Sequence, residues 1–211
     1  MSMGRERGIG LWLLALAMGA GAGPASAHPH IFADTRIAFL RDAEGDVTAL
    51  RVRWHYDAFT SLTLWDILDL DPERDGILDA EDFAKVAEGE TDWPEGYTGD
   101  LHLSDGPGFA RPVDAEAGEE DERIWVSFTL PFEAPRDAGA LMVEVYDPIY
   151  YYAYTVEAEA PEGCTAEVLR PDLDDAAEEL RLRLAALSRE EVPDDPNVGA
   201  AFAETVVLTC D

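Results

Sequence analysis

Two consecutive segments in which apolar and polar residues alternate constrain the fold of this chain more than any other feature. Residues 30–40 and Val47–Tyr56 both have the two-residue period of strands that bury one face. In the second segment, Val52 and Trp54 fall on one face and arginines fall on the other. A short polar stretch joins the two segments, so the sequence predicts an antiparallel hairpin.

The spacing of apolar residues changes to that of a helix directly after the hairpin. Residues 58–70 predict a helix. Its expected buried stripe consists of Phe59, Leu62, Trp65 and Leu68. A second helix follows an acidic loop, with Asp79 as N-cap and Asp82 at the capping-box position. These features predict an inserted helix-loop-helix unit that covers residues 58–90.

The acidic loop, residues 71–82, fits the twelve-residue calcium-binding loop of an EF-hand. Oxygen-bearing side chains fall at positions 1, 3, 5, 9 and 12, and Gly76 takes position 6, where the loop turns sharply. The predicted calcium ligands are Asp71, Glu73, Asp75, the backbone carbonyl of Ile77, Asp79 and Asp82. Glutamate at position 3 and aspartate at position 12 depart from the usual pattern, which predicts a dissociation constant of about 10⁻⁴ to 10⁻³ M. The alternative is a capped acidic turn that binds no ion.

The remaining chain returns to short strands separated by turns, with one further helix. Residues 115–123 are an acidic run that we interpret as a hairpin loop or solvated linker. Residues 172–188 predict an amphipathic helix. The expected fold is α+β and mainly β, an antiparallel β-sandwich-like domain with an EF-hand-like insertion and a C-terminal helix. We expect residues 28–211 to form this single domain.

Residues 1–27 have the features of a Sec-type secretory signal peptide. Arg5 and Arg7 supply the positive region, an apolar run follows, and Ala25-Ser26-Ala27 supplies small residues for cleavage. The apolar run is too short to span a bilayer comfortably. We therefore expect cleavage after Ala27 and a periplasmic protein that is not membrane-anchored after this cleavage.

Cleavage after Ala27 would make His28 the first residue of the mature chain, followed by Pro29 and His30. His28 would then carry both an α-amine and an imidazole, and Pro29 favours an extended conformation for it. Because alternate side chains of an extended chain share a face, Asp34 would point the same way as His28 and His30. Amine, imidazole and carboxylate groups suit zinc, nickel, cobalt or copper. The sequence predicts a transition-metal site at these three residues, and the alternative is a frayed terminus.

His55 and Asp57 form a second imidazole–carboxylate pair at strand spacing, which we consider the weaker metal-site candidate. Pairing of the hairpin strands could bring His55 near His30, but the sequence leaves the register open. The alternative is a solvent-facing histidine beside two arginines.

The chain has two cysteines, Cys164 and Cys210. An exported chain folds in an oxidising compartment, so we predict a disulfide between them. The chain-entropy model assigns such a crosslink about 4 kcal/mol. A metal-binding cysteine pair is the alternative, but neither a CxxC spacing nor a nearby histidine supports it.

The formal net charge of −30 repels nucleic acid and concentrates cations around the protein. The sequence has no nucleophile motif, phosphate-binding loop or dinucleotide fingerprint. We therefore expect a binding protein rather than an enzyme.

Several of these motifs together resemble the DUF1007 family of bacterial proteins. They are His28-Pro29-His30-Ile31-Phe32-Ala33-Asp34, Trp54…Tyr56-Asp57, the loop at 71–82, Tyr146-Asp147-Pro148…Tyr150-Tyr151 and Gly163-Cys164…Cys210. The resemblance covers essentially the whole chain after residue 27. It implies a periplasmic component of a nickel/cobalt-type transport system, with an inner-membrane metal permease as partner. The family pattern has a carboxylate after Asp57, where this chain has Ala58. The pattern does not require a histidine at position 55 or 102, so the resemblance does not imply that His55 or His102 is a metal ligand.

The leading hypothesis is a periplasmic accessory protein that captures a transition-metal ion and supports its transport. One alternative is a copper-dependent oxidative enzyme that uses the N-terminal histidine, which would need a third facing histidine and an open substrate surface. The other alternative is a calcium-stabilised interaction module without a transition metal.

Overall fold

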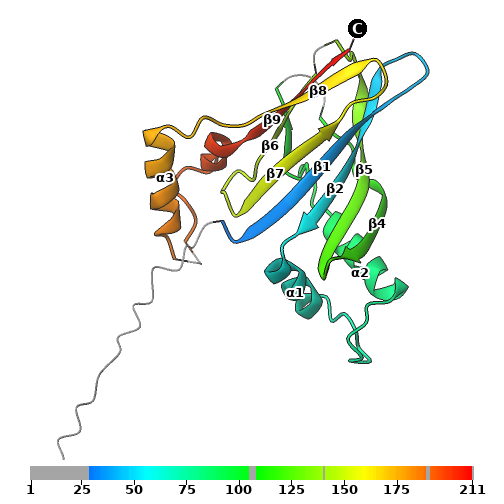
Figure 1. Cartoon of the computed structure of the whole chain (residues 1–211), viewed down its shortest axis with the longest axis vertical. Helices are drawn as coiled ribbons and strands as arrows, with labels where there is room; N and C mark the ends of the chain where they lie inside the picture. Colours follow the sequence, from blue (N-terminus) through cyan, green and yellow to red (C-terminus); the bar gives the residue numbers. More distant parts are fainter. Residues whose placement is uncertain (1–28, 105–107, 140, 189–190, 211) are drawn as a thin grey trace, which may run out of the picture.

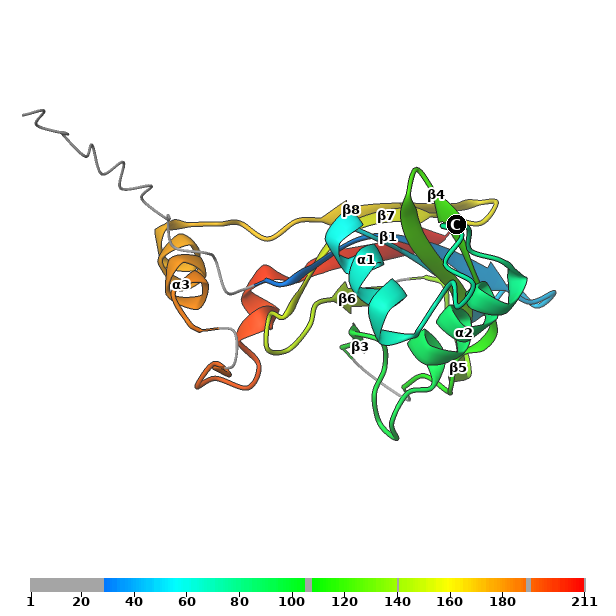
Figure 2. The same cartoon turned by 90° about the horizontal axis from the view of Figure 1, so that it is seen from below.

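The computed structural model describes residues 29–104, 108–139, 141–188 and 191–210, and the description below is confined to them. Two β-sheets form the body of the protein, and helices lie at its ends (Figures 1 and 2). The strands are β1 (Ile31–Arg41), β2 (Val47–Tyr56), β3 (Leu101–Leu103), β4 (Val113–Glu120), β5 (Arg123–Arg136), β6 (Leu141–Val145), β7 (Tyr152–Glu159), β8 (Cys164–Leu169) and β9 (Glu204–Cys210). The helices are α1 (Ala58–Ile67), α2 (Ala80–Thr91) and α3 (Asp175–Ala185), with a short 3-10 helix η1 (Val198–Phe202).

The two sheets share one apolar core. The larger sheet has the strand order β4-β5-β2-β1-β7, and the smaller one has the order β3-β6-β9-β8. Neighbouring strands are antiparallel except β1 and β7, which run parallel. Side chains from both sheets are fully buried in the core, among them Ile37, Val52 and Phe128 from the larger sheet and Val143 and Leu208 from the smaller one. The predicted mainly-β architecture is confirmed.

The predicted hairpin is also confirmed, because β1 and β2 pair antiparallel along their length. The alternation of side chains works as expected, with Trp54 and Tyr56 buried and His55 between them half-buried on the opposite face. The register places Asp34 directly opposite His55.

The helices lie at two separate places around the sheets. α1 and α2 lie at the end of the larger sheet where β2 finishes, and α2 packs against β4 and β5 (Figures 1 and 2). α3 lies apart, on the other side of the molecule. No helix among the described residues is long and apolar enough to cross a bilayer. The predicted signal peptide, residues 1–27, lies outside the described part of the chain.

The first half of α1 is oriented differently from what its apolar spacing predicts, whereas Trp65 and Leu68 pack against the core as predicted. Phe59 and Leu62 were expected to be buried, but they are 67% and 66% exposed, and Ile67 is 70% exposed. The buried residues of α1 are Thr60 and Ser61. Leaving large apolar side chains in water forgoes about 1.5–3 kcal/mol for each one relative to full burial.

Hydrogen bonds at the end of the sheet account for this orientation. The Ser61 hydroxyl accepts a hydrogen bond from the backbone N–H of Ile124 at 2.9 Å, at the beginning of β5. The same hydroxyl donates to the backbone carbonyl of Asp57 at 2.8 Å. The Thr60 hydroxyl donates to the Asp57 carboxylate at 3.0 Å. Since a buried N–H without a partner is costly, Thr60 and Ser61 face the sheet and Phe59 and Leu62 do not.

The acidic run at 115–123 is a strand for most of its length and not the predicted loop or linker. β4 pairs with β5 and forms the edge of the larger sheet. Glu116 forms an ion pair with Arg51, and Glu120 forms one with Arg53 at 2.7 Å. Carboxylates are therefore tolerated here because arginines of β2 reach across β5 to pair with them, and a charged edge resists pairing with other chains.

The predicted disulfide is confirmed. Cys164 and Cys210 are bonded and lie directly opposite each other on β8 and β9. The backbone N–H of Cys164 donates to the carbonyl of Pro161, and that of Cys210 donates to the carbonyl of Ala138. The crosslink ties the last strand of the chain to its neighbour at the end of the smaller sheet.

Candidate functional site

The only described histidine of the predicted terminal metal site is His30, and it is held at the entrance to β1. Its backbone N–H donates to the carbonyl of Tyr151 at 2.8 Å, and its ring lies 4.6 Å from the Tyr151 ring, centroid to centroid. The Nε2 atom of His30 is buried. His28 lies outside the described residues.

Asp147 fixes the segment that holds His30. Its carboxylate accepts the backbone N–H groups of Tyr151 at 2.6 Å and Tyr152 at 2.9 Å, which folds the chain into a turn directly before β7. The Tyr151 carbonyl then points at the His30 N–H. The turn that Asp147 shapes and His30, which are far apart in sequence, therefore meet in the structure.

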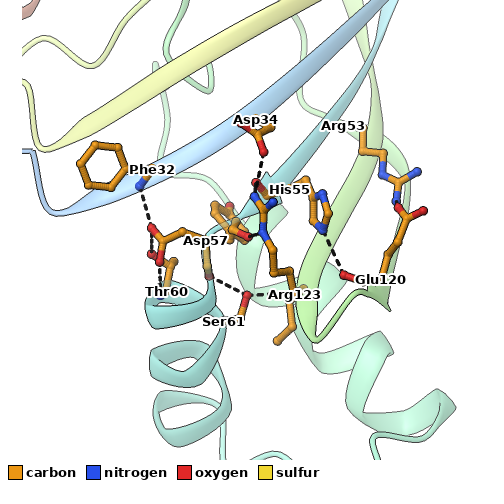
Figure 3. Close-up of polar contacts among 11 residues, drawn as sticks. Phe32, Asp34, Arg53, His55, Asp57, Thr60, Ser61, Glu120 and Arg123 are labelled. Atoms are coloured by element: carbon orange, nitrogen blue, oxygen red, sulfur yellow. Dashed lines mark hydrogen bonds and ion pairs between the residues drawn. The ribbon is translucent and has the colours of Figure 1, made fainter.

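Asp34 lies away from His30 and close to a different histidine. Four residues of extended chain span about 13 Å, so Asp34 and His30 are too far apart to bind one ion. The Asp34 carboxylate instead accepts a hydrogen bond from Arg123 at 2.8 Å and faces His55 across the hairpin (Figure 3). Among the described residues, no three His, Cys, Asp or Glu side chains are grouped so as to hold a metal ion. The inclusion of Asp34 in the terminal site is therefore unsupported.

The exposed face of the larger sheet has a polar hollow of about 320 Å³, which we call the sheet hollow. Its charged and titratable lining residues are Asp34, Arg36, Arg53, His55, Glu120 and Glu157. Different strands of the larger sheet contribute opposite charges to this hollow, and these side chains pair with one another. Arg53 binds Glu120 at 2.7 Å, and Arg36 binds Glu157 at 3.1 Å (Figure 3 shows the first pair).

The sheet hollow is a poor site for a metal ion. The Nε2 atom of His55 lies 3.3 Å from the carbonyl oxygen of Glu120, and a carbonyl only accepts, so this contact is a hydrogen bond when Nε2 carries the proton. Nδ1 of His55 and one oxygen of Asp34 are then the available ligands. Two ligands rarely hold a specific ion, and the guanidinium groups of Arg36, Arg53 and Arg123 repel a further cation. We therefore interpret this surface as a set of paired charges.

Asp57 does not join His55, because it caps α1. Its carboxylate accepts the backbone N–H of Thr60 at 2.9 Å, the Thr60 hydroxyl at 3.0 Å and the backbone N–H of Phe32 at 3.0 Å (Figure 3). Partial burial raises the pKa of Asp57, but the hydrogen bonds from Thr60 and Phe32 outweigh burial and lower it overall. β2 ends at Tyr56, so the strand spacing that suggested a pair with His55 does not continue to Asp57.

The backbone of the predicted calcium loop has several features of an EF-hand. Gly76 has a φ angle of 80°, as the sharp turn at position 6 requires. The Asp71 carboxylate accepts the N–H groups of Asp75 at 3.0 Å and Gly76 at 2.8 Å, which curls the loop around position 1. The loop connects α1 to α2, as predicted.

Position 12 of the loop fits calcium less well. Asp82 is 2% exposed, and its two oxygens accept the backbone N–H groups of Asp71 at 3.1 Å and Asp79 at 3.2 Å. The Lys85 ammonium lies 3.5 Å from the same carboxylate. Burial raises the pKa of Asp82, and the two backbone hydrogen bonds and Lys85 lower it further than burial raises it. A calcium ion would have to compete with these groups for Asp82.

The remaining histidine, His102, packs against Tyr146 in the smaller sheet. Its Nε2 lies 3.0 Å from the carbonyl oxygen of Tyr146, and its ring stacks on the Tyr146 ring at 4.0 Å. It belongs to β3 in the smaller sheet, whereas His55 lies beside Asp34 in the larger one. Neither histidine faces His30, so the third ligand that a copper enzyme would need has no candidate among the described residues.

A buried group of carboxylates and tyrosines was not anticipated from the sequence. Asp100 is 3% exposed and accepts a hydrogen bond of 2.6 Å from the Tyr154 hydroxyl. Glu90 accepts one from Tyr56, which is fully buried, and burial raises the pKa of Glu90. The concentration of tyrosines after Asp147 was visible in the sequence, but no local pattern marks Asp100 or Glu90 as their partners.

Comparisons with known proteins identify one family and one relative. The family model described as "Protein of unknown function (DUF1007)" matches residues 13–210. An uncharacterized protein from Haemophilus influenzae is 20% identical over 197 residues, which cover 88% of this chain and 92% of that protein. Because the family model spans nearly the whole sequence, this chain belongs to the DUF1007 family.

Proposed function

We propose that this protein is an exported metal-handling accessory protein. In this proposal it captures a transition-metal ion at its mature N-terminus in the periplasm and supports transfer of the ion to an inner-membrane permease. The metal is the cargo of the protein. The ligands are the α-amine and imidazole of His28 and the imidazole of His30.

The observation that carries the proposal is the connection between the two most specific sequence motifs. Asp147 shapes the turn that presents the Tyr151 carbonyl, and this carbonyl holds the backbone of His30. A free chain end would lose conformational entropy each time it closed around an ion. An imidazole that is already fixed two residues from the mature terminus reduces that loss, as in other preorganised binding sites.

Two further properties support an exported cation-binding protein. The net charge of −30 raises the local concentration of cations around the protein. The Cys164–Cys210 disulfide is typical of proteins that fold in oxidising compartments. Neither property selects a particular metal, so zinc, nickel, cobalt and copper all have to be compared.

Calorimetric titration of these metals into the processed protein tests the proposal. The comparison uses three further proteins: a form with one alanine added before His28, His30→Ala, and His102→Ala as a matched control. Moving the amine away and removing the second imidazole should each weaken binding by about tenfold or more, since two remaining ligands rarely hold a specific ion. His102→Ala should bind as the unmodified protein does, because that ring stacks on Tyr146 in the other sheet.

Equal affinities for all four proteins would contradict the proposed site. A second measurement separates the copper-enzyme alternative from metal handling. Metal binding without oxygen consumption in the presence of a reductant is expected for an accessory protein, whereas sustained copper-dependent oxidation would favour an enzyme. Ligation by imidazole also requires the neutral ring, so affinity should fall as the pH drops through about 6.5.

A further inference from the structure

The outer side of α1 and the loop after it form an exposed surface that the metal proposal does not use. Phe59, Leu62 and Ile67 all project into solvent from this short helix. Leu62 also belongs to a groove of about 610 Å³, whose apolar lining includes Trp65 and Leu70. We call the helix face and this groove together the α1 surface.

The outward direction of these side chains is built into the fold. The opposite side of the first turn of α1 is fixed by the hydrogen bonds of Thr60 and Ser61, so the helix cannot turn Phe59 and Leu62 inward without breaking the bond to the Ile124 N–H. Isolated exposed apolar residues are ordinary on protein surfaces. Three of them on one helix, beside a groove that is lined by both apolar and charged residues, favour an interaction site.

The groove has a strongly acidic border. Asp66, Asp69 and Asp71 line it, against one guanidinium group from Arg74. Asp71 is buried and its carboxylate accepts two backbone N–H groups of the loop, so a partner that covers the apolar residues meets the exposed carboxylates of Asp66 and Asp69. Lys or Arg side chains next to apolar ones satisfy both requirements, as in helices that bind with one apolar face in a groove.

We propose that the α1 surface is a docking site for a basic amphipathic helix of another protein. The apolar face of that helix covers Phe59, Leu62 and Ile67, and its flanking cations pair with the carboxylates of the groove. The surface acts without metal at the N-terminus, so this inference is independent of the proposed metal site.

The charge of the protein selects this occupant over two others. A second copy of the chain would bring another surface from a molecule of net charge −30, and an anionic membrane surface would be repelled in the same way. Only a partner with positive charge gains from the acidic border. Its binding should weaken with increasing salt, because exposed charge pairs are screened.

Fluorescence anisotropy with designed peptides tests the proposal on the processed protein in EDTA. The probe is a labelled helical peptide of leucine and lysine. The two comparison peptides replace lysine by glutamate or leucine by serine. The leucine/lysine peptide should bind, Leu62→Ser should weaken its binding about tenfold, and the double variant Asp66→Asn, Asp69→Asn should weaken it about threefold.

Leu182→Ser is the matched control, because Leu182 is 57% exposed on α3 and lies outside the α1 surface. It should leave peptide binding unchanged, and circular dichroism should show both leucine variants to be folded. The proposal is overturned if the leucine/lysine peptide does not bind, if either comparison peptide binds as tightly, or if the two leucine variants behave alike. Sedimentation that shows a dimer dissociated by Leu62→Ser would replace it with self-association.

Discussion

The Tyr154 hydroxyl donates a 2.6 Å hydrogen bond to the Asp100 carboxylate between the two sheets. Tyr154 belongs to β7 of the larger sheet, and Asp100 directly precedes β3 of the smaller one. The backbone carbonyl of Asp100 also accepts the N–H of Tyr146, just after β6. This residue therefore links both sheets, and its protonation state affects how tightly they are joined.

Asp100 should make the protein less stable as the pH rises. Burial raises the pKa of Asp100 from 3.8 to about 7, and the nearby Asp147 adds to the effect while the Tyr154 hydrogen bond opposes it. Between these two values the folded protein keeps a proton that the unfolded chain has released. The contribution of Asp100 to the free energy of unfolding should thus be most favourable below pH 3.8 and should fall as the pH rises toward 7.

The variant Asp100→Asn tests this expectation, since its side chain is neutral at every pH and still accepts from Tyr154. A shift of roughly three pKa units corresponds to about 4 kcal/mol, so the variant should be more stable than the unmodified protein at pH 8 by up to that amount. At pH 4 the two proteins should be similar. Urea unfolding at a series of pH values measures the free energy of unfolding of both proteins. A constant difference between the two proteins at all pH values would contradict a raised pKa of Asp100.

Asp57→Ala should destabilise the protein more than removal of an ordinary helix cap. An N-cap contributes about 1 kcal/mol, and Asp57 also binds the backbone N–H of Phe32 in β1, so we expect a loss of about 2 kcal/mol. Asp174→Ala is the matched control, because Asp174 caps α3 through the Ala177 N–H. It should cost about 1 kcal/mol. Equal losses in thermal unfolding would mean that the bond to Phe32 contributes nothing.

Strand alternation made much of the fold predictable, whereas hydrogen bonds between distant elements did not follow from the sequence. The hairpin of β1 and β2 could be predicted, because a one-residue change of register would expose Trp54 and its neighbours. The exposure of Phe59 and Leu62 could not, because it depends on the Ile124 N–H that meets Ser61. The spacing of apolar residues in a helix indicates which of its faces is apolar. It does not indicate which backbone N–H of a distant segment needs an acceptor.

The candidate sites show the same division. The grouping of His30 with Asp34 assumed that residues on one strand face share one ion, but strand geometry separates them by about 13 Å. Asp34 meets His55 through the register of the hairpin, which local sequence does not determine. The acidic β4 was interpreted as a loop because the arginines that neutralise it, such as Arg53, are distant in sequence.

Reduction of the disulfide should destabilise the protein by about 4 kcal/mol, because the crosslink spans a sequence separation of 46 residues. The denatured, unreduced protein should contain no titratable thiol. A Cys164→Ala, Cys210→Ala variant is the control, and reductant should leave its melting temperature unchanged. Two reactive thiols in the unreduced protein would contradict the crosslink.

Calcium should stabilise the protein through the loop between α1 and α2, although weakly. For a dissociation constant of about 10⁻³ M, calcium at about 10 mM adds about 1.4 kcal/mol to the free energy of unfolding. Asp71→Ala should abolish this gain, but it also removes the hydrogen bonds from Asp75 and Gly76 and lowers stability without calcium. The relevant quantity is therefore the calcium-dependent rise in melting temperature and not the melting temperature itself.

Glu73→Gln separates the two effects of Asp71→Ala, because Glu73 is exposed and occupies position 3 of the loop. It should reduce the calcium response while leaving the melting temperature in EDTA unchanged. Asp82 is the reason for expecting a small response, since its oxygens already accept the N–H groups of Asp71 and Asp79 and an ion must displace them. If calcium shifts the melting temperature of none of these proteins, the loop is a capped acidic turn, and its carboxylates serve to begin α2.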